Sequence, residues 1–149
     1  MNVVVPDYGV GSTNKAPDIF SGVSFTASDG RVINNTASGP ALARNIDMQG
    51  STQAQRSILR LRAGRLRVFG SFSNLFDSYI QDLGTVAEFA STGNQTITGG
   101  SFTVIEFSGG GTKNLLGVMR VSLSMTFLPN GGLLTTDISQ PDNNFVDLG

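Results

Sequence analysis

The sequence predicts a mainly β fold, an antiparallel β-sandwich or barrel with one short α-helix and extended arms and loops. Several short segments alternate apolar and polar residues with the period of a β-strand, and turn residues separate them, among 19 Gly and 5 Pro. A single segment spaces its apolar residues as a helix does. Many short strands with one helix are typical of an antiparallel sandwich or barrel.

The chain of 149 residues has the length of one domain. Its first residues are interrupted by Pro and Gly, which predicts an extended arm, and its last residues are polar, which predicts a tail. We therefore divide the chain into an arm (1–22), a β core (23–129) and a tail (130–149).

The core begins with a weak hairpin signal. Residues 23–27 alternate, Asp29-Gly30 is a turn dipeptide, and residues 31–34 form the predicted return strand. Residues 35–55 are polar and predict a long loop.

Residues 59–68 read Leu-Arg-Leu-Arg-Ala-Gly-Arg-Leu-Arg-Val, almost the same in both directions. A tight hairpin centred on Ala63-Gly64 would pair these two halves across two short strands. A single strand with a bulge at Gly64 is the alternative, because the apolar positions change phase there. In either structure the arginines gather on one face, where like charges destabilise a sheet. We therefore expect an anionic group to meet that face.

The predicted helix covers about residues 74–83. Its apolar residues fall at positions 75, 76, 79, 80 and 83, which is helical spacing. Ser73 or Asn74 can cap its start, and Gly84 can end it.

The second half of the core predicts further strands, at residues 85–90, 96–98, 101–107 and 117–128. The last of these has the clearest alternation, with Met119, Val121, Leu123, Met125 and Phe127 on one side. The segment 108–114 is rich in Gly, but it lacks the Gly-Lys-Ser/Thr order of a phosphate-binding loop. It predicts a flexible loop.

The composition makes an enzyme the weakest class. The chain contains no His and no Cys, which removes the commonest general base and every thiolate. We expect no catalytic residue, no metal, no cofactor and no small-molecule substrate. No signal peptide and no membrane-spanning run is recognisable, so we expect a soluble protein made in a cytoplasm. Only 14% of residues are charged, which suggests a surface covered by partners.

The order of elements over residues 58–128 resembles the tail tube proteins of tailed bacteriophages. The resemblance rests on a strand–helix–strand pattern carried by Gly64-Arg65, Val68, Gly70-Ser71-Phe72, Leu75-Phe76-Asp77 and Gly84-Thr85, followed by a long alternating strand. It implies a β-sandwich subunit that forms rings, commonly hexameric, which stack into a tube that DNA passes through without specific binding. It also implies a virion protein assembled in the host bacterial cytoplasm, with copies of itself and other virion proteins as partners.

Other functions stay open beside this resemblance. A tail terminator or distal tail protein would use a related fold, and a capsid decoration protein would also be β-rich with ordered arms. A carbohydrate-binding sandwich usually presents Trp or Tyr, whereas this chain has no Trp and only Tyr8 and Tyr79. Light scattering and electron microscopy would separate ring-forming subunits from the others.

The candidate site is the arginine cluster. It could contact carboxylates of a neighbouring subunit, lie in solvent, or bind DNA. Repeated arginine–phosphate contacts would hold DNA in place, which does not suit a conduit. We favour a subunit contact made by Arg60, Arg62, Arg65 and Arg67, with Asp137, Asp142 and Asp147 of the tail as partners. Asp77 and Asp82 on the predicted helix are further candidates.

Overall fold

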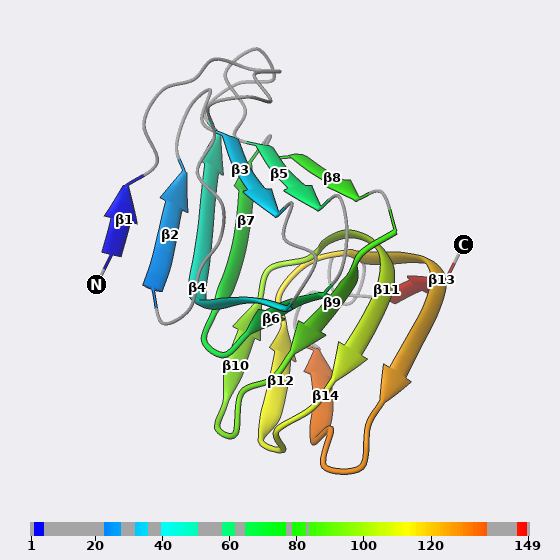
Figure 1. Cartoon of the computed structure of the whole chain (residues 1–149). Helices are drawn as coiled ribbons and strands as arrows, with labels where there is room; N and C mark the ends of the chain where they lie inside the picture. The colour runs from blue at the N-terminus through cyan, green and yellow to red at the C-terminus, as the bar shows by residue number, and fades with distance from the viewer. Residues whose placement is uncertain are drawn as a thin grey trace.

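The chain is described by a computed structural model as a β-solenoid, in which strands stack in coils along one axis (Figure 1). The described residues are 2–4, 23–27, 32–35, 40–50, 58–61, 65–76, 79–82, 84–136 and 146–148. Every strand pairing among them is parallel. The prediction of a mainly β protein is confirmed. The predicted antiparallel sandwich or barrel is wrong, since antiparallel neighbours would require reversed strands.

The described strands form a twelve-stranded sheet and a three-stranded sheet. Their bounds are β1 Asn2–Val4, β2 Val23–Ala27, β3 Val32–Asn35, β4 Pro40–Gly50, β5 Ile58–Leu61, β6 Arg65–Val68, β7 Phe72–Phe76, β8 Tyr79–Asp82, β9 Val86–Phe89, β10 Gln95–Ile97, β11 Gly100–Phe107, β12 Thr112–Leu115, β13 Met119–Phe127, β14 Leu133–Thr136 and β15 Val146–Leu148.

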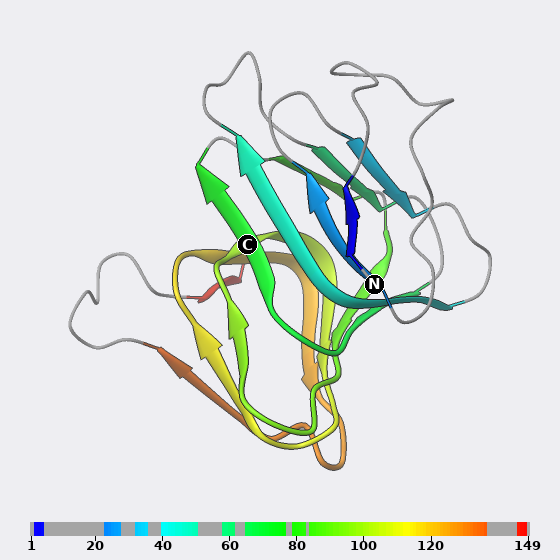
Figure 2. The same cartoon turned by 90° about the vertical axis from the view of Figure 1, so that its left-hand side faces the viewer.

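The coils present three faces. The first face contains the start of β4, then β6, β9 and the second halves of β11 and β13. The second face contains β1, β2, the end of β4, β7, β10, β12 and β14, and Figure 2 shows β2, β4 and β7 side by side. The third face contains β3, β5 and β8, with β11 beside β8, and then β13 and β15.

Coil length varies along the chain. Ile46 pairs with Phe72, 26 residues later, whereas Gln95 pairs with Lys113, 18 residues later. This variation hides the repeat from a search at one fixed period.

The core is a stack of apolar columns inside the solenoid. On the first face Val68, Phe89, Phe107 and Phe127 lie in register, one per coil. The Phe107 ring stacks on Phe89 at 6.0 Å and on Phe127 at 4.7 Å between ring centroids. Each inward residue therefore packs on the equivalent residue of the next coil, which buries the alternating apolar set.

Glycines form a column at the corner between the first and second faces. A Cβ built on Gly111 would lie 2.1 Å from the carbonyl oxygen of Gly93, and one on Gly132 would lie 2.0 Å from that of Gly111. Gly111 and Gly132 also have positive φ values of 68° and 78°. The corner turns stack this closely only because side chains are missing there.

Several local predictions change with this fold. The predicted helix at 74–83 is wrong, because β7 and β8 occupy its described residues. The predicted loop at 35–55 contains β4, the longest described strand at 11 residues, and the predicted loop at 108–114 leads into β12. The clear alternation at 117–128 corresponds to β13.

The arginine palindrome does not form a tight hairpin. Its first half lies in β5, which pairs with β3 and β8 on the third face. Its second half forms β6, which pairs with β4 and β9 on the first face. The turn residues 62–64 lie outside the described part of the chain. The mirror symmetry of the sequence therefore does not correspond to a symmetry of pairing.

Candidate functional site

The first face carries an ion network on its outer side. Arg65 and Arg67 alternate with buried residues along β6 and point outward. Arg67 is in register with Glu88 of β9, and Glu88 is in register with Glu106 of β11. The parallel stacking therefore brings acidic and basic side chains of three coils together.

Glu88 is the centre of this network. Its Oε2 accepts hydrogen bonds from Arg65 Nη1 at 2.8 Å and Arg67 Nε at 2.6 Å, and its Oε1 accepts one from Ser108 Oγ at 2.6 Å. Arg65 also bonds to Glu106. The Glu88 side chain is only 4% exposed, whereas Arg67 is 43% exposed. The arginines cover the carboxylate and leave their own outer surface in solvent.

The network keeps Glu88 ionised. Burial by itself raises the pKa of the Glu88 carboxyl, but hydrogen bonds from Ser108, Arg67 and Arg65 outweigh it and hold the pKa below its usual value. The hydrogen bond to Glu106 raises the pKa of Arg65. A general acid needs a raised pKa, so the Glu88 carboxyl is poorly suited to act as one.

The structure places the sequence-predicted site residues in different environments. Arg65 and Arg67 do meet carboxylates, but these are Glu88 and Glu106 of the same chain. Asp147 lies on β15, where its Oδ2 is 3.7 Å from Arg120 Nε. Arg60 lies on β5, on the third face. The remaining predicted residues, Arg62, Asp77, Asp137 and Asp142, lie outside the described residues, so a contact to another subunit stays a prediction for them.

Asp82 closes a corner between coils. Its Oδ1 accepts hydrogen bonds from the backbone N–H groups of Gly84 at 3.0 Å and Thr85 at 2.9 Å. Its Oδ2 accepts one from the N–H of Thr103 on the next coil at 2.6 Å. The bond from Gly84 is that of an Asx turn, and the bond from Thr103 joins two coils, so this carboxylate has a structural role.

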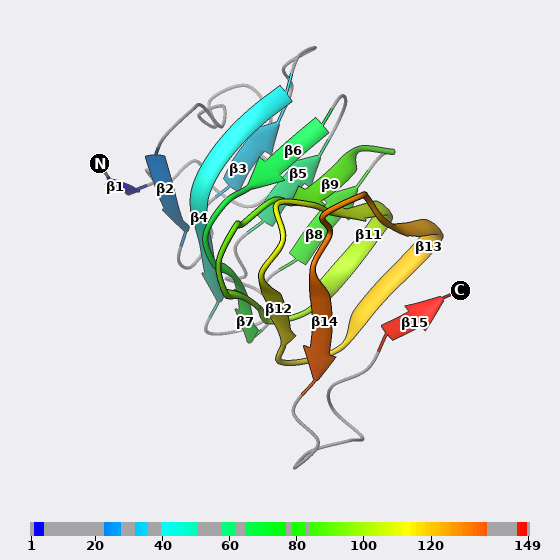
Figure 3. The ribbon, with the colours of Figure 1, turned by 90° about the horizontal axis from the view of Figure 1, so that it is seen from below.

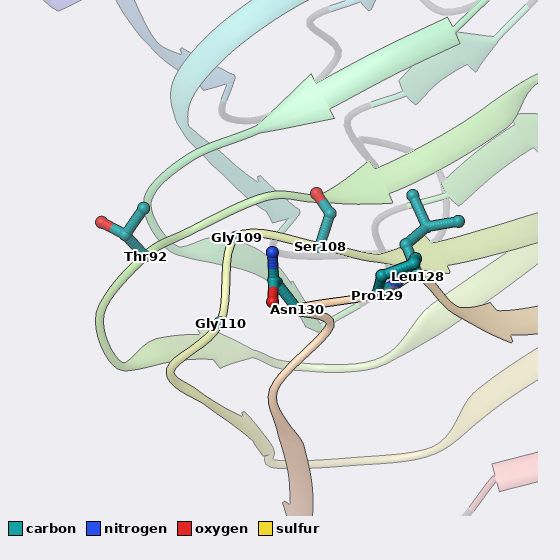
Figure 4. A pocket seen from close by; sticks show the side chains of 7 residues that line it. All are labelled: Thr92, Ser108, Gly109, Gly110, Leu128, Pro129 and Asn130. Atoms are coloured by element: carbon teal, nitrogen blue, oxygen red, sulfur yellow. The ribbon is translucent and has the colours of Figure 1, made fainter.

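A pocket of about 610 Å³ lies where the turns of three coils meet (Figure 4). It is lined by Thr92, Ser108, Gly109, Gly110, Leu128, Pro129 and Asn130. Its polar side chains are uncharged, and the Ser108 hydroxyl already donates to Glu88. None of the lining side chains is itself a base, and the carboxylate that the Ser108 hydroxyl contacts is bound by Arg65 and Arg67.

Beneath this corner, two buried polar side chains satisfy backbone groups. Lys113 is fully buried, and its Nζ donates to the carbonyl oxygens of Ser91 at 2.6 Å and Gly110 at 2.7 Å. Burial lowers the pKa of Lys113. Gln95 Nε2 donates to the carbonyl oxygens of Val68 at 2.8 Å and Gly70 at 2.6 Å. Sequence reasoning missed both, although their inward positions in an alternating strand were a usable signal.

The second candidate surface is the carboxyl-terminal end of the solenoid, formed by β13, β14 and β15 (Figure 3). It exposes four large apolar side chains: Leu123 at 74%, Phe127 at 45%, Leu133 at 61% and Leu148 at 65%. The described residues of these three strands carry two charged side chains, Arg120 and Asp147. The described part of this end is therefore largely apolar.

These observations define the chain as a β-solenoid protein. Comparison with known protein families, with curated protein sequences and with solved structures gives no match. Within the described ranges, no cluster of His, Cys, Asp and Glu side chains could hold a metal ion. No helix among those ranges is long and apolar enough to cross a membrane.

Proposed function

We propose that this chain is a non-enzymatic structural protein whose solenoid assembles with further copies of itself. The observation that carries the proposal is the apolar surface of the described terminal coil, with Leu133 and Leu148 exposed. Exposed apolar side chains that gather on one surface mark a site of contact with a partner.

The charged groups on the first face support a structural role. Glu88 and Glu106 both bond to Arg65 within the chain. Such a network links successive coils and fixes their register. It leaves no free acid–base pair on that face of the described chain, which disfavours a hydrolase.

The setting of the assembly stays a prediction from the sequence. The resemblance to tail tube proteins favours a virion and stacked rings around DNA. Part of that resemblance used the helix at 74–83, where the described residues are strands. We therefore propose the coarser role, a self-assembling structural subunit, and leave the tail tube as one form that it could take.

Light scattering coupled to size exclusion tests the proposal on the full chain. We expect a mass above that of one chain, rising with concentration, and discrete assemblies by negative-stain electron microscopy. Stacked rings with a central hole would identify a tube subunit. A strictly monomeric protein at high concentration would contradict self-assembly.

A further inference from the structure

We infer that the corner between the first and second faces binds an uncharged carbohydrate, which lies along the solenoid from the corner pocket to Phe69. This inference goes beyond the proposed self-assembly, and neither depends on the other. It is carried by the lining of the pocket, by a row of stacked residues that leads away from it, by the exposed ring of Phe69 and by the backbone of Asn130.

The pocket offers groups that suit a ligand with hydroxyl groups and no charge. Thr92 and Asn130 contribute a hydroxyl and an amide to its lining, and Leu128 and Pro129 contribute apolar surface (Figure 4). An amide both donates and accepts hydrogen bonds, so it can pair with a sugar hydroxyl, while apolar side chains can contact the C–H groups of a sugar ring. A charged ligand finds no opposite charge among the lining side chains.

A row of equivalent residues leads from the pocket along the solenoid: Leu128, Ser108, Ala90 and Phe69, one in each coil. Each donates its backbone N–H to the carbonyl that precedes the equivalent residue one coil earlier, at 2.9 to 3.0 Å. Each also follows directly on an inward residue of the apolar column on the first face, so the alternation turns it outward. Neighbouring coils lie about 4.8 Å apart, so three steps provide room for several linked sugars rather than one.

Phe69 provides an aromatic surface at the far end of this row. Its side chain is 44% exposed, although it lies on a coil whose inward residues are fully packed. The small Ala90 beside it is buried, so no larger side chain separates the ring from Ser108. An exposed aromatic ring is a flat apolar surface on which the C–H face of a sugar can pack. The chain has no Trp, and phenylalanine takes that part here.

The ion network borders the row and favours an uncharged ligand. Arg67 lies two residues before Phe69, on the same side of the chain, and its guanidinium is 43% exposed. Its Nε bonds to Glu88, and its other N–H groups can donate to hydroxyl groups. The network joins two arginines, Arg65 and Arg67, to two glutamates, Glu88 and Glu106, so its charges cancel.

The backbone at Asn130 supports a ligand at the pocket. Its φ is 92°, and among the described residues it is the one residue other than glycine with a positive φ. The stacked turn of the preceding coil has Gly109 and Gly110 in this conformation, both at 78°. Glycine adopts such a φ without steric cost, whereas asparagine does not. The chain therefore keeps an amide in the pocket at a position that favours glycine, and strain of this kind gathers at ligand sites.

Native electrophoresis of the full chain in gels that contain a soluble polysaccharide tests the inference. The neutral polysaccharides are galactomannan, xyloglucan, dextran and soluble starch, and the anionic one is polygalacturonate. We expect at least one neutral polysaccharide to retard the chain, equally at low and high salt. Retardation by none of them overturns the inference. Retardation by polygalacturonate alone, lost at high salt, assigns binding to the exposed arginines and overturns it as well.

Two variants locate the ligand at this corner. Phe69→Ala removes the ring and Asn130→Gly removes the amide, and each should raise the dissociation constant for the retarding polysaccharide by about tenfold or more. Leu116→Ala removes an apolar side chain of similar exposure, 45%, that lies outside the row. Asn94→Gly changes an exposed turn residue outside the pocket lining. These two are the matched controls and should leave the dissociation constant unchanged.

Thermal melting separates a ligand contact from a structural role for Asn130. Because glycine relaxes the backbone, Asn130→Gly should melt no lower than the wild type and still lose binding. Unchanged binding in Phe69→Ala and Asn130→Gly overturns the inference, and so does a joint loss of stability and binding in Asn130→Gly. Light scattering of the same variants should give the mass of the wild type, so self-assembly and carbohydrate binding can fail separately.

Discussion

The middle coils and the terminal coil of this solenoid are built from the same kind of alternating strand. They differ in that the middle coils pair their buried charged groups, whereas the terminal coil exposes large apolar side chains. In the middle coils Glu88 is covered by two arginines and Lys113 is bonded to two carbonyl groups. In the terminal coil Phe127 and Leu133 remain exposed. The contrast shows that these polar groups of the middle coils find partners within the chain, whereas the described part of the terminal coil leaves large apolar side chains exposed.

The largest expected effect comes from truncating the phenylalanine column at two heights. Phe107 is fully buried between two rings, so Phe107→Ala should lower the free energy of unfolding by about 3 to 5 kcal/mol. Phe127→Ala, at the half-exposed end of the column, should cost less than half as much in the monomer. Urea unfolding at low protein concentration measures both, and equal losses would contradict the contrast between the coils.

The glycine column offers the next comparison. Gly111→Ala would force a Cβ against the Gly93 carbonyl at a positive φ, which should cost about 2 to 3 kcal/mol. Gly93→Ala meets no atom within 4 Å and is the matched control, with little expected change. If thermal melting shows the same loss of stability for both variants, then the close stacking of the turns is not the reason that Gly111 must be glycine.

The ion network should contribute less than the core. Glu88→Gln removes the charge that Arg65 and Arg67 share, and should cost about 1 to 2 kcal/mol, since solvent screens the exposed side of the arginines. Asp147→Asn breaks only an exposed pair, and should change stability by less than about 0.5 kcal/mol.

The pH dependence provides a second measurement of the same network. Because the folded-state pKa of Glu88 is lowered, its contribution is present above the ordinary value of 4.5 and is lost as the pH falls through the folded-state pKa. Wild type should therefore lose its advantage over Glu88→Gln in acid. An unchanged difference between them from pH 7 to pH 3 would argue against an ionised Glu88.

The last prediction concerns Lys113 and has the same pH direction in an alkaline window. Its folded-state pKa is lowered by burial, so the unfolded chain binds more protons between that pKa and the ordinary 10.5. The stability of the wild type relative to Lys113→Met should therefore rise with pH in this window. A relative stability that falls with pH would mean that the buried amine is better stabilised when charged.

Part of the fold could be predicted from local patterns. The alternation of Met119, Val121 and Met125 gave the strand β13, and the punctuation by Gly marked several turns. The helix was mispredicted because apolar residues at 75, 76, 79 and 80 have helical spacing, although they belong to two strands of adjacent faces. A corner between two strands shifts the phase of the alternation and so imitates a helical period.

The sequence predicted that the arginines of the candidate site need anionic partners, but not which residues these partners are. The sequence indicated that an anionic group must meet the arginines of β6, and the structure supplies Glu88 and Glu106. The identity of these partners could not be read from spacing, because Arg65 and Glu88 are 23 positions apart and coil length varies. The recurrence of Gly93, Gly111 and Gly132, each followed three residues later by Thr or Asn, was the one sequence signal of stacked coils.

The sequence by itself determined that the chain forms short β-strands, that it lacks His and Cys, and that its arginines need anionic partners. Only the tertiary structure decided that all described strands are parallel and that the partners lie one and two coils away. The physical reason is that a period of two fixes which side chains share a side of a strand. It contains no information about the direction of the neighbouring strand, which the corner turns and the stacking of buried side chains determine.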